Sequence, residues 1–401
     1  MKPFLPLFTA LLLAAAPIAP ASAADTPKQS SAKAKAAKAA QTKEARLKAA
    51  KAREAKAKAA KAAVAAAAAA AAATTAAVNY DGEHVNFAEW QAVREFIDEM
   101  VVQHGFDQAS LETLFSQVRF VDSAVQLVKP APPGKPKNWQ AYSARFIEPI
   151  RIRAGVRFWN ENASALERAE AAYGVPAEII VGIIGIETIY GRDTGRFRVL
   201  DTLATLAFAY PETPNRASRM DFFRSELGNT LLLARERKLD PFLLLGSFAG
   251  AVGMPQFMPG NILKFGVDFD GDGRVDLRDS ASDAIGSVAN FLIQHGWNAQ
   301  HRGATVWPAH VSPNRAWEPL LDLGLQATLR PEQLREAGVV TQAPLPSGRL
   351  YGLIDLQNGA EPTEYWVVDD NFFAITKYNR SYFYAMSVID LGRAVRAQRA
   401  R

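Results

Sequence analysis

The 401-residue chain contains no cysteine, so it can form neither a disulfide nor a thiolate metal site. It has only five histidines, and none forms the His-x-x-x-His pair that zinc hydrolases use. A phosphate-binding Gly-x-x-x-x-Gly-Lys loop and a Gly-x-Ser-x-Gly nucleophile elbow are also missing from the sequence. After the N-terminal apolar segment, no run of large apolar residues reaches the ~20 residues that a membrane-spanning helix needs. These absences argue against several common enzyme classes.

The N-terminus has the pattern of a secretory signal peptide. Lys2 is followed by an apolar run from Leu5 to Ile18 and by the small-residue cleavage signal Ala21-Ser22-Ala23. We therefore predict a signal peptide over residues 1–23 and a periplasmic mature protein. The lack of cysteine also removes the residue to which a lipid anchor would be attached.

Composition and charge change sharply along the chain. Residues 24–77 form an Ala/Lys-rich linker, in which Lys28 to Lys61 carry twelve Lys or Arg against two Glu. From Val78 onward there are 33 Lys or Arg against 38 Asp or Glu, so we expect no nucleic-acid partner for this part. The linker lacks the large apolar side chains of a core. Two interpretations stay open: a solvated spacer, or a basic linker that contacts anionic lipid or another acidic polymer.

The remainder predicts a mainly α protein of the α+β type. Apolar residues recur at helical spacing from Phe87 to about Leu127, within an N-terminal α domain over 78–150. A proline-rich stretch from Lys129 to Pro136 interrupts the pattern, and a helix should run from Pro149 to about Tyr173. A further helical block is expected from Ala177 to about Trp297.

A small β domain over 301–375 is predicted from a change in pattern after residue 300. Leu350–Leu356 and Tyr365–Val368 are typical of strands, Asp369 to Asn371 is typical of a turn, and Phe372–Thr376 should form the next strand. Residues 376–401 should then return to the helical core.

Glu187 is the only carboxylate in the apolar segment from Ile179 to Tyr190. A helix that is apolar on all sides must be buried, and Gly182 and Gly185 would let another helix approach closely. Burial raises the pKa of an unpaired carboxyl, which can then keep its proton near neutral pH and serve as a general acid. A structural interpretation also stays open, in which Glu187 pairs with a buried Arg or ends its helix facing water.

The segment from Asp268 to Asp279 matches the twelve-residue EF-hand loop. Asp occupies positions 1, 3 and 5, Gly273 provides the sharp turn at position 6, and Arg274 offers a backbone carbonyl at position 7. Position 12 is Asp279 instead of the usual Glu, and helices should flank the loop at Asn261–Gly266 and Ser282–His295. The pattern predicts one structural calcium site, with a metal-free Asp/Gly turn as the alternative. A calcium switch is not expected from a single loop.

Five segments in this order resemble the membrane-bound lytic murein transglycosylase B family. The segments are Ile183–Gly191, Gly246–Pro259, the EF-hand-like loop, Asp283–Trp297 and Tyr378–Ser381, within a region from about Trp90 to Gly392. The resemblance implies a lysozyme-like helical core over 151–300 and a peptidoglycan-cleaving lyase. Two positions depart from the family pattern, since Gly260-Asn261 replace a frequent Ser-Ser pair and Ser218 replaces the first of two arginines.

The resemblance also implies roles for individual residues. Glu187 would be the catalytic residue. The side chains implied to bind the glycan strand are Ser247, Gln256, Arg219, Phe222, Tyr190, Tyr378, Asn379 and Tyr384. The implied calcium ligands are Asp268, Asp270, Asp272, Arg274 and Asp279. No organic cofactor is implied.

The implied reaction cleaves the β-1,4 bond between N-acetylmuramic acid and N-acetylglucosamine and leaves 1,6-anhydro ends. Most glycosidases need two carboxylates, whereas no second acid lies in an apolar run like that of Glu187. A single acid/base with a nucleophile from the sugar fits that pattern. The alternatives are a muramidase that uses water and a non-catalytic peptidoglycan-binding protein. Other cell-wall enzymes are candidate partners, and the basic linker could contact the wall.

Overall fold

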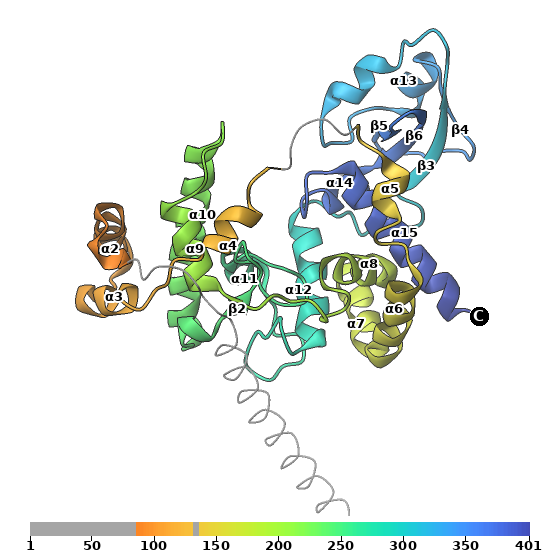
Figure 1. Ribbon diagram of the computed structural model, residues 1–401. Helices are drawn as coiled ribbons and strands as arrows, with labels where there is room; N and C mark the ends of the chain where they lie inside the picture. Colours follow the sequence, from red (N-terminus) through yellow and green to blue (C-terminus); the bar gives the residue numbers. More distant parts are fainter. Residues whose placement is uncertain (1–85, 131–135) are drawn as a thin grey trace, which may run out of the picture. The chain divides into compact units, whose positions relative to one another are not determined.

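The computed structural model describes residues 86–130 and 136–401 (Figure 1). The predicted signal peptide over 1–23 and linker over 24–77 lie outside the described residues. So does most of the proline-rich stretch, because residues 131–135 are not described.

Helices make up most of the described chain before residue 300, as predicted. Their bounds are Phe87–Glu89 (η1, a 3-10 helix), Gln91–His104 (α2), Gln108–Phe115 (α3), Asp122–Leu127 (α4), Trp139–Ser143 (α5), Pro149–Glu161 (α6), Ala163–Tyr173 (α7), Ala177–Thr188 (α8), Val199–Phe208 (α9), Arg216–Arg237 (α10), Pro241–Leu243 (η2, 3-10), Pro259–Phe265 (α11) and Ala281–Gln294 (α12).

Two helix predictions need correction. The single helix expected from Pro149 to Tyr173 is two helices, α6 and α7, because the backbone leaves the helical region at Asn162 and the Asn162 side chain donates to the carbonyl of Phe158. The helical block expected from Ala177 to Trp297 is right only in part. Non-helical segments follow α8 and α10, and they contain the short antiparallel pair Phe197–Arg198 (β1) and Leu245–Gly246 (β2).

The apolar helix α8 packs against the C-terminal helix α15, Tyr382–Arg399. A Cβ atom built on Gly182 would lie 2.2 Å from the backbone oxygen of Val388, and one built on Gly392 would lie 2.2 Å from the backbone oxygen of Glu178. The two helices therefore approach backbone to backbone, which the predicted role of Gly182 anticipated. Glu178 and Gly182 on α8 meet Gly392 and Val388 on α15 in reverse order, as in an antiparallel pair.

The N-terminal helices pack on α9 and α10. Arg224 of α10 pairs with Glu99 of α2 at 3.0 Å, and the backbone N–H of Val121 donates to the buried Thr205 hydroxyl of α9 at 3.0 Å. Their apolar residues join the same core as α8 and α15. The expected boundaries at 150, 300 and 375 stay predictions.

A four-stranded antiparallel sheet follows, in the order β4-β3-β6-β5. The elements of this region are Val306–Val311 (β3), Glu318–Leu323 (η3, 3-10), Pro331–Glu336 (α13), Val339–Thr341 (β4), Tyr351–Asn358 (β5) and Glu361–Asp369 (β6). β5 and β6 overlap the two predicted strands, whereas β3 and β4 were not anticipated. A small second core of buried residues that includes Trp307, Tyr351 and Val367 lies here.

The strand predicted over Phe372–Thr376 is wrong, because Asp370–Ile375 is a helix, α14. The predicted turn is the start of this helix. The Asp369 carboxylate accepts from the backbone N–H groups of Asn371 at 3.1 Å and Phe372 at 3.3 Å, which is an N-cap. Every residue from Asn371 to Ile375 is buried, so the apolar run has no polar face from which its period could be recognised.

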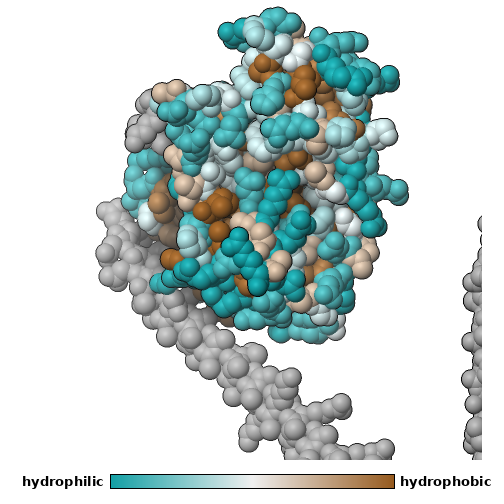
Figure 2. Space-filling view, turned by 90° about the vertical axis from the view of Figure 1, so that its right-hand side faces the viewer, coloured by the Kyte–Doolittle hydropathy of each residue, from teal (hydrophilic) through white to brown (hydrophobic). Residues whose placement is uncertain are grey.

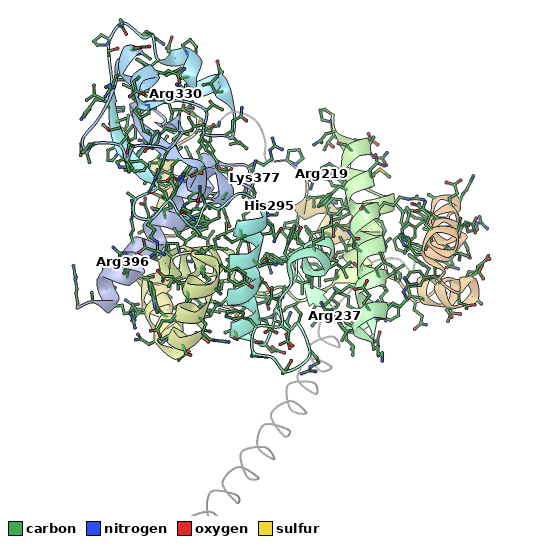
Figure 3. The ribbon with its side chains drawn as sticks, turned by 180° about the vertical axis from the view of Figure 1, so that it is seen from behind. Arg219, Arg237, His295, Arg330, Lys377 and Arg396 are labelled. Atoms are coloured by element: carbon green, nitrogen blue, oxygen red, sulfur yellow. The ribbon has the colours of Figure 1, made fainter. Side chains whose placement is uncertain are left out.

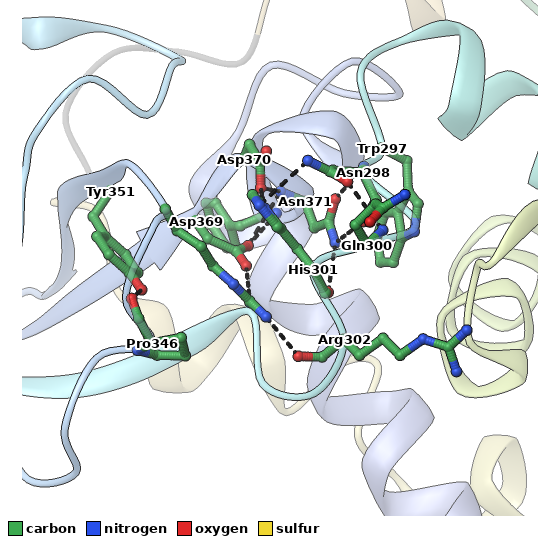
Figure 4. Close-up of polar contacts among 12 residues, drawn as sticks. Trp297, Asn298, Gln300, His301, Arg302, Pro346, Tyr351, Asp369, Asp370 and Asn371 are labelled. Atoms are coloured by element: carbon green, nitrogen blue, oxygen red, sulfur yellow. Dashed lines mark hydrogen bonds and ion pairs between the residues drawn. The ribbon is translucent and has the colours of Figure 1, made fainter.

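A polar network joins the sheet to the end of α12 (Figure 4). The Asn371 side chain accepts from the Asn298 backbone N–H at 2.6 Å and donates to the Asn298 carbonyl, and Asp370 pairs with His301 at 2.8 Å. Buried Asp369 pairs with Arg349 at 3.1 Å. His301, Asp369 and Asp370 lie close enough to hold a metal ion. In the described structure these side chains hold the start of α14 to the segment that follows α12, which is a structural role.

No single helix among the described residues is long and apolar enough to cross a membrane, although α7 and α8, bent by 118°, pass that test together. One face of the surface carries small apolar groups separated by hydrophilic residues (Figure 2).

Candidate active site

Glu187 lies in the last turn of α8 and faces α15. The Tyr384 hydroxyl donates to Glu187 Oε1 at 2.5 Å, and Tyr384 is fully buried in the first turn of α15. Glu187 itself keeps part of its surface open. The antiparallel crossing of α8 and α15 thus continues to the point where the carboxyl meets its hydrogen-bond partner.

Burial raises the pKa of Glu187 to about 7, and the hydrogen bond from Tyr384 opposes this shift only in part. The negative charge of Glu187 in turn helps to raise the pKa of Tyr384, Tyr378 and Tyr142, although burial is the largest cause for each. Among the residues that the structure describes, no second carboxylate contributes to the Glu187 pKa. The carboxyl can therefore hold or release a proton near neutral pH. The ionisable side chains whose pKa it affects are those of Tyr384, Tyr378 and Tyr142.

Tyr142 was not predicted as a site residue. Its ring lies 5.5 Å from Phe383 of α15 and carries the Arg145 guanidinium 4.6 Å from its centroid. The local sequence does not indicate that Tyr142 belongs to the site. Helix α5 is only five residues long, and Tyr142 lies 45 positions before Glu187 in the chain. Only the fold brings it to the carboxyl.

A strained turn directly follows Glu187. Ile189 has φ 52° and Tyr190 has φ 60°, and such left-handed backbone is costly for a β-branched residue. The buried hydroxyl of Thr188 stabilises the turn: it donates to the Met254 carbonyl at 2.9 Å and accepts from the Gly191 N–H at 3.0 Å. Backbone strain of this kind is common at functional sites, where surrounding contacts hold it.

The loop from Gly246 to Phe257 holds two of the predicted side chains. Gln256 has φ 52°, and its amide donates to the carbonyls of Gly253 at 3.0 Å and Thr194 at 3.3 Å. Ser247 Oγ accepts from the backbone N–H of Ala251 at 3.0 Å. Both side chains are partly exposed, but the polar contacts they make here hold the loop itself in shape.

The remaining predicted residues lie in three different surroundings. Tyr378 stacks on Tyr384 with a centroid distance of 6.4 Å, so it belongs with Glu187, while Asn379 is exposed beside it. Arg219 and Phe222 lie on α10, where Phe222 is 40% exposed and the Arg219 guanidinium lies 5.4 Å from its ring (Figure 3). No direct contact between these α10 residues and Glu187 is seen.

Tyr190 points into the protein. Its ring lies 5.2 Å from Phe158, and its buried hydroxyl lies over Gly155 and Gly185, where a Cβ atom would be 2.4 and 2.5 Å away. The hydroxyl has no hydrogen-bond partner in the described structure. The predicted stacking of Tyr190 on a sugar is therefore not favoured by this geometry.

The acidic loop at 268–279 lies between α11 and α12, close to the expected flanking helices. Asp268 accepts from the N–H groups of Gly271 at 2.7 Å and Gly273 at 2.8 Å, which folds the loop back on its first carboxylate. Asp268 and Asp270 lie close enough to share an ion with Asp283, which was not predicted. The side chains of Asp272 and Asp279 lie outside that group.

Asp283 is fully buried at the start of α12 and accepts from the backbone N–H groups of Phe269 and Asp276, both at 2.8 Å. Six aspartates and two arginines lie between residues 268 and 283. Clustered carboxylate and carbonyl oxygens are the donors that a hard divalent cation prefers. The residues present therefore fit a calcium ion.

The model of the transglycosylase SLT domain family matches residues 86–393. The chain belongs to this family, and it is a lytic transglycosylase. It is 42% identical over 325 residues to the membrane-bound lytic murein transglycosylase B of Escherichia coli strain K12, covering 79% of this chain and 86% of that protein.

Solved structures agree with this assignment. The catenated lytic transglycosylase SltB1 of Pseudomonas aeruginosa is 42% identical, with a TM-score of 0.71, and the match covers 78% of this chain and 99% of that one. The Escherichia coli lytic transglycosylase Slt35 in complex with calcium is 41% identical, with a TM-score of 0.69, covering 79% and 96% of the two chains. SltB3 of Pseudomonas aeruginosa, solved with NAG-NAM-pentapeptide, is 27% identical with a TM-score of 0.65, covering 79% and 80%.

Proposed function

We propose that the chain cleaves the β-1,4 bond between N-acetylmuramic acid and N-acetylglucosamine in peptidoglycan, with Glu187 as its single acid and base. The observation that carries this proposal is one partly exposed carboxyl whose pKa is raised to about 7 and whose nearest polar partner is the Tyr384 hydroxyl. The family's activity and the peptidoglycan fragment bound to SltB3 support the choice of substrate.

The first step transfers the Glu187 proton to the glycosidic oxygen while the bond from the anomeric carbon to that oxygen breaks. The Tyr384 hydroxyl remains hydrogen bonded and stabilises the carboxylate that forms. The substrate's 2-acetamido group would assist at the anomeric carbon during this step and be displaced in the next.

The second step forms the 1,6-anhydro ring. The Glu187 carboxylate takes the proton of the substrate's C6 hydroxyl, whose oxygen bonds to the anomeric carbon. The proton lost in the first step is thereby regained, and no water is consumed. A single carboxyl suffices because the nucleophile belongs to the sugar.

The glycan strand would contact the side chains nearest this carboxyl, Tyr378 and Asn379, and the Gln256 loop that Thr188 connects to α8. Arg219 and Phe222 of α10 offer an exposed aromatic ring and a cation for a more distant saccharide or peptide. Aromatic rings stack on sugar faces, and the exposed part of Phe222 suits that role.

A structural calcium ion is proposed for the acidic loop, held by Asp268, Asp270, Asp272, the Arg274 carbonyl and Asp279, with buried Asp283 bracing the loop backbone. The bound ion would neutralise the excess of aspartates. It supplies no step of the reaction.

The substrate places the enzyme outside the cytoplasm. We propose the periplasm, reached through a signal peptide at 1–23, with the basic linker contacting the wall or anionic lipid. Partners among other cell-wall enzymes belong to the same proposal.

Digestion of purified peptidoglycan tests the reaction. Mass spectrometry should find 1,6-anhydro ends with the wild type and none with Glu187→Gln. Reducing muramic ends, heavier by one water, would instead indicate a muramidase. Equal results for wild type and Glu187→Gln would indicate a non-catalytic binding protein.

A further inference from the structure

A cavity of about 490 Å³ lies beside the first turn of α15. Its lining includes Arg380, Tyr382 and Phe383 around the start of α15, and Lys137, Leu325 and Asp355 from elsewhere in the chain. The Tyr382 hydroxyl donates to the Gly324 carbonyl, next to Leu325, at 3.3 Å. The volume is in the range of sites that hold small molecules or short peptides.

Two exposed cations lie at this cavity, the Lys137 ammonium and the Arg380 guanidinium. Among the residues that the structure describes, neither forms an ion pair. The one carboxylate in the lining, Asp355, accepts a hydrogen bond from Gln357 at 2.7 Å. The cavity lining therefore carries an excess of positive charge, and neither cation is used in an ion pair that stabilises the fold.

The first turn of α15 both lines this cavity and contacts the active-site carboxyl. Phe383 packs against Trp139 and against Tyr142, in both cases with centroids 5.5 Å apart. Tyr142 is close enough to Glu187 for the carboxylate charge to raise its pKa. The next residue after Phe383, Tyr384, donates to Glu187. Two consecutive residues of one helical turn therefore reach the two places, Phe383 the cavity and Tyr384 the carboxyl.

We propose that this cavity binds the peptide stem of peptidoglycan and that Lys137 and Arg380 bind a carboxylate of that stem. The proposal rests on the proposed function, because the stem is attached to the sugar that Glu187 acts on. An Arg guanidinium can hold a carboxylate with two parallel hydrogen bonds, and Lys adds a point charge. A five-residue stem extends up to about 17 Å, so its terminal carboxylate can lie well away from the sugar that carries it.

Kinetics on two matched substrates test this assignment: glycan strands with their peptide stems, and the same strands after an amidase has removed the stems. The variants are Lys137→Gln, Arg380→Gln and their combination. Arg330→Gln is the control, because Arg330 is exposed at the start of α13 (Figure 3) and does not line the cavity. All changes are at exposed side chains, and equal melting temperatures confirm that the variants are folded.

The double variant should lose about tenfold in kcat/KM on stem-bearing strands relative to stem-free strands, mainly through a higher KM, while the control loses nothing. Raising the salt concentration should remove the wild-type preference for stem-bearing strands, since exposed charges are screened. An equal loss on both substrates, or no loss on stem-bearing strands, would overturn the stem site. Inactivity of the wild type on both substrates would instead reject the proposed function, and this proposal with it.

Discussion

Burial of the Glu187 carboxyl destabilises the folded protein, and the same burial would make the carboxyl suitable as the proposed general acid. Burial in the apolar end of α8 raises its pKa to about 7 from an ordinary value of 4.5. Between these two pH values the unfolded chain ionises while the folded chain does not, so the free energy of unfolding falls as pH rises.

Replacing Glu187 with Gln removes this penalty without changing the side-chain shape. We expect Glu187→Gln to abolish lytic activity and to be more stable than wild type above pH 7, by up to about 3 kcal/mol. The difference should shrink as pH falls and vanish near pH 4.5. Urea unfolding of both proteins between pH 4 and 8 measures it, and a constant difference across this range would contradict the assigned cause.

Wild-type activity should follow the protonated form of Glu187. The value of kcat/KM is expected to fall about tenfold per pH unit well above pH 7, because the general acid is lost there. A pH–rate profile on purified peptidoglycan measures the fall. A rate that stays flat to pH 9 would show that Glu187 is not the acid of the free enzyme.

Tyr190 can be tested as an internal residue. Its hydroxyl is buried without a partner, so Tyr190→Phe should leave KM and kcat within about twofold and leave stability unchanged or higher by about 1 kcal/mol. If the hydroxyl bound a sugar, KM would rise instead. Steady-state kinetics and thermal unfolding distinguish the two.

At the residue scale, the sequence allowed the residue types suited to catalysis or metal binding to be recognised, but not the contacts that these residues make in the fold. Glu187 could be singled out because it is the only carboxylate in an apolar run, and the aspartates at 268–272 because their spacing has a metal-binding pattern. Tyr142 and Asp283 could not, since a partner far along the chain or a backbone cap leaves no local pattern. Tyr190 was assigned to the substrate because an aromatic next to a catalytic residue has the same sequence signature whether it points inward or outward.

At the scale of elements, the approach of α8 to α15 fixes the active site. Gly182 lies against the α15 backbone at Val388, one turn away from the contact between Glu187 and Tyr384. Both contacts lie where α8 crosses α15. A substitution that moves the helices apart at Gly182 should therefore also change the distance between the Glu187 carboxyl and the Tyr384 hydroxyl.

Gly182→Ala should force the helices apart, because its Cβ would lie 2.2 Å from the Val388 oxygen. We expect a loss of about 2–3 kcal/mol in stability from overpacking and at least a tenfold fall in kcat. Gly105→Ala is a useful contrast, since its Cβ meets nothing within 4 Å, so backbone strain is its only cost. Unfolding and kinetics at 25 °C test both, and wild-type kcat in Gly182→Ala would refute the coupling.

Element types were predictable wherever one face is polar. The periodic segment that became α2 is one example. α14 was predicted as a strand because all of Asn371–Ile375 is buried, and only the Asp369 cap shows that the chain starts a helix there. The break between α6 and α7 depends on a single asparagine, which composition does not reveal.

At the scale of the whole molecule, the acidic loop links α11 to α12 within the main core. Calcium should raise the melting temperature by several degrees, because ligand at 100 times its Kd adds about 2.7 kcal/mol. Asp268→Asn should lose most of this gain, while Asp322→Asn, at an exposed site in η3, should keep it. Scanning calorimetry with calcium and with chelator measures the shift, and a large calcium-dependent change in circular dichroism would point to a switch.

The contact between Glu187 and Tyr384 joins residues 197 positions apart in the chain. During synthesis, α8 exists long before α15, and until α15 packs against it the carboxyl lacks its hydroxyl partner. Activity that depends on this contact would therefore appear only once α15 has been made and has packed against α8, however early α8 itself folds.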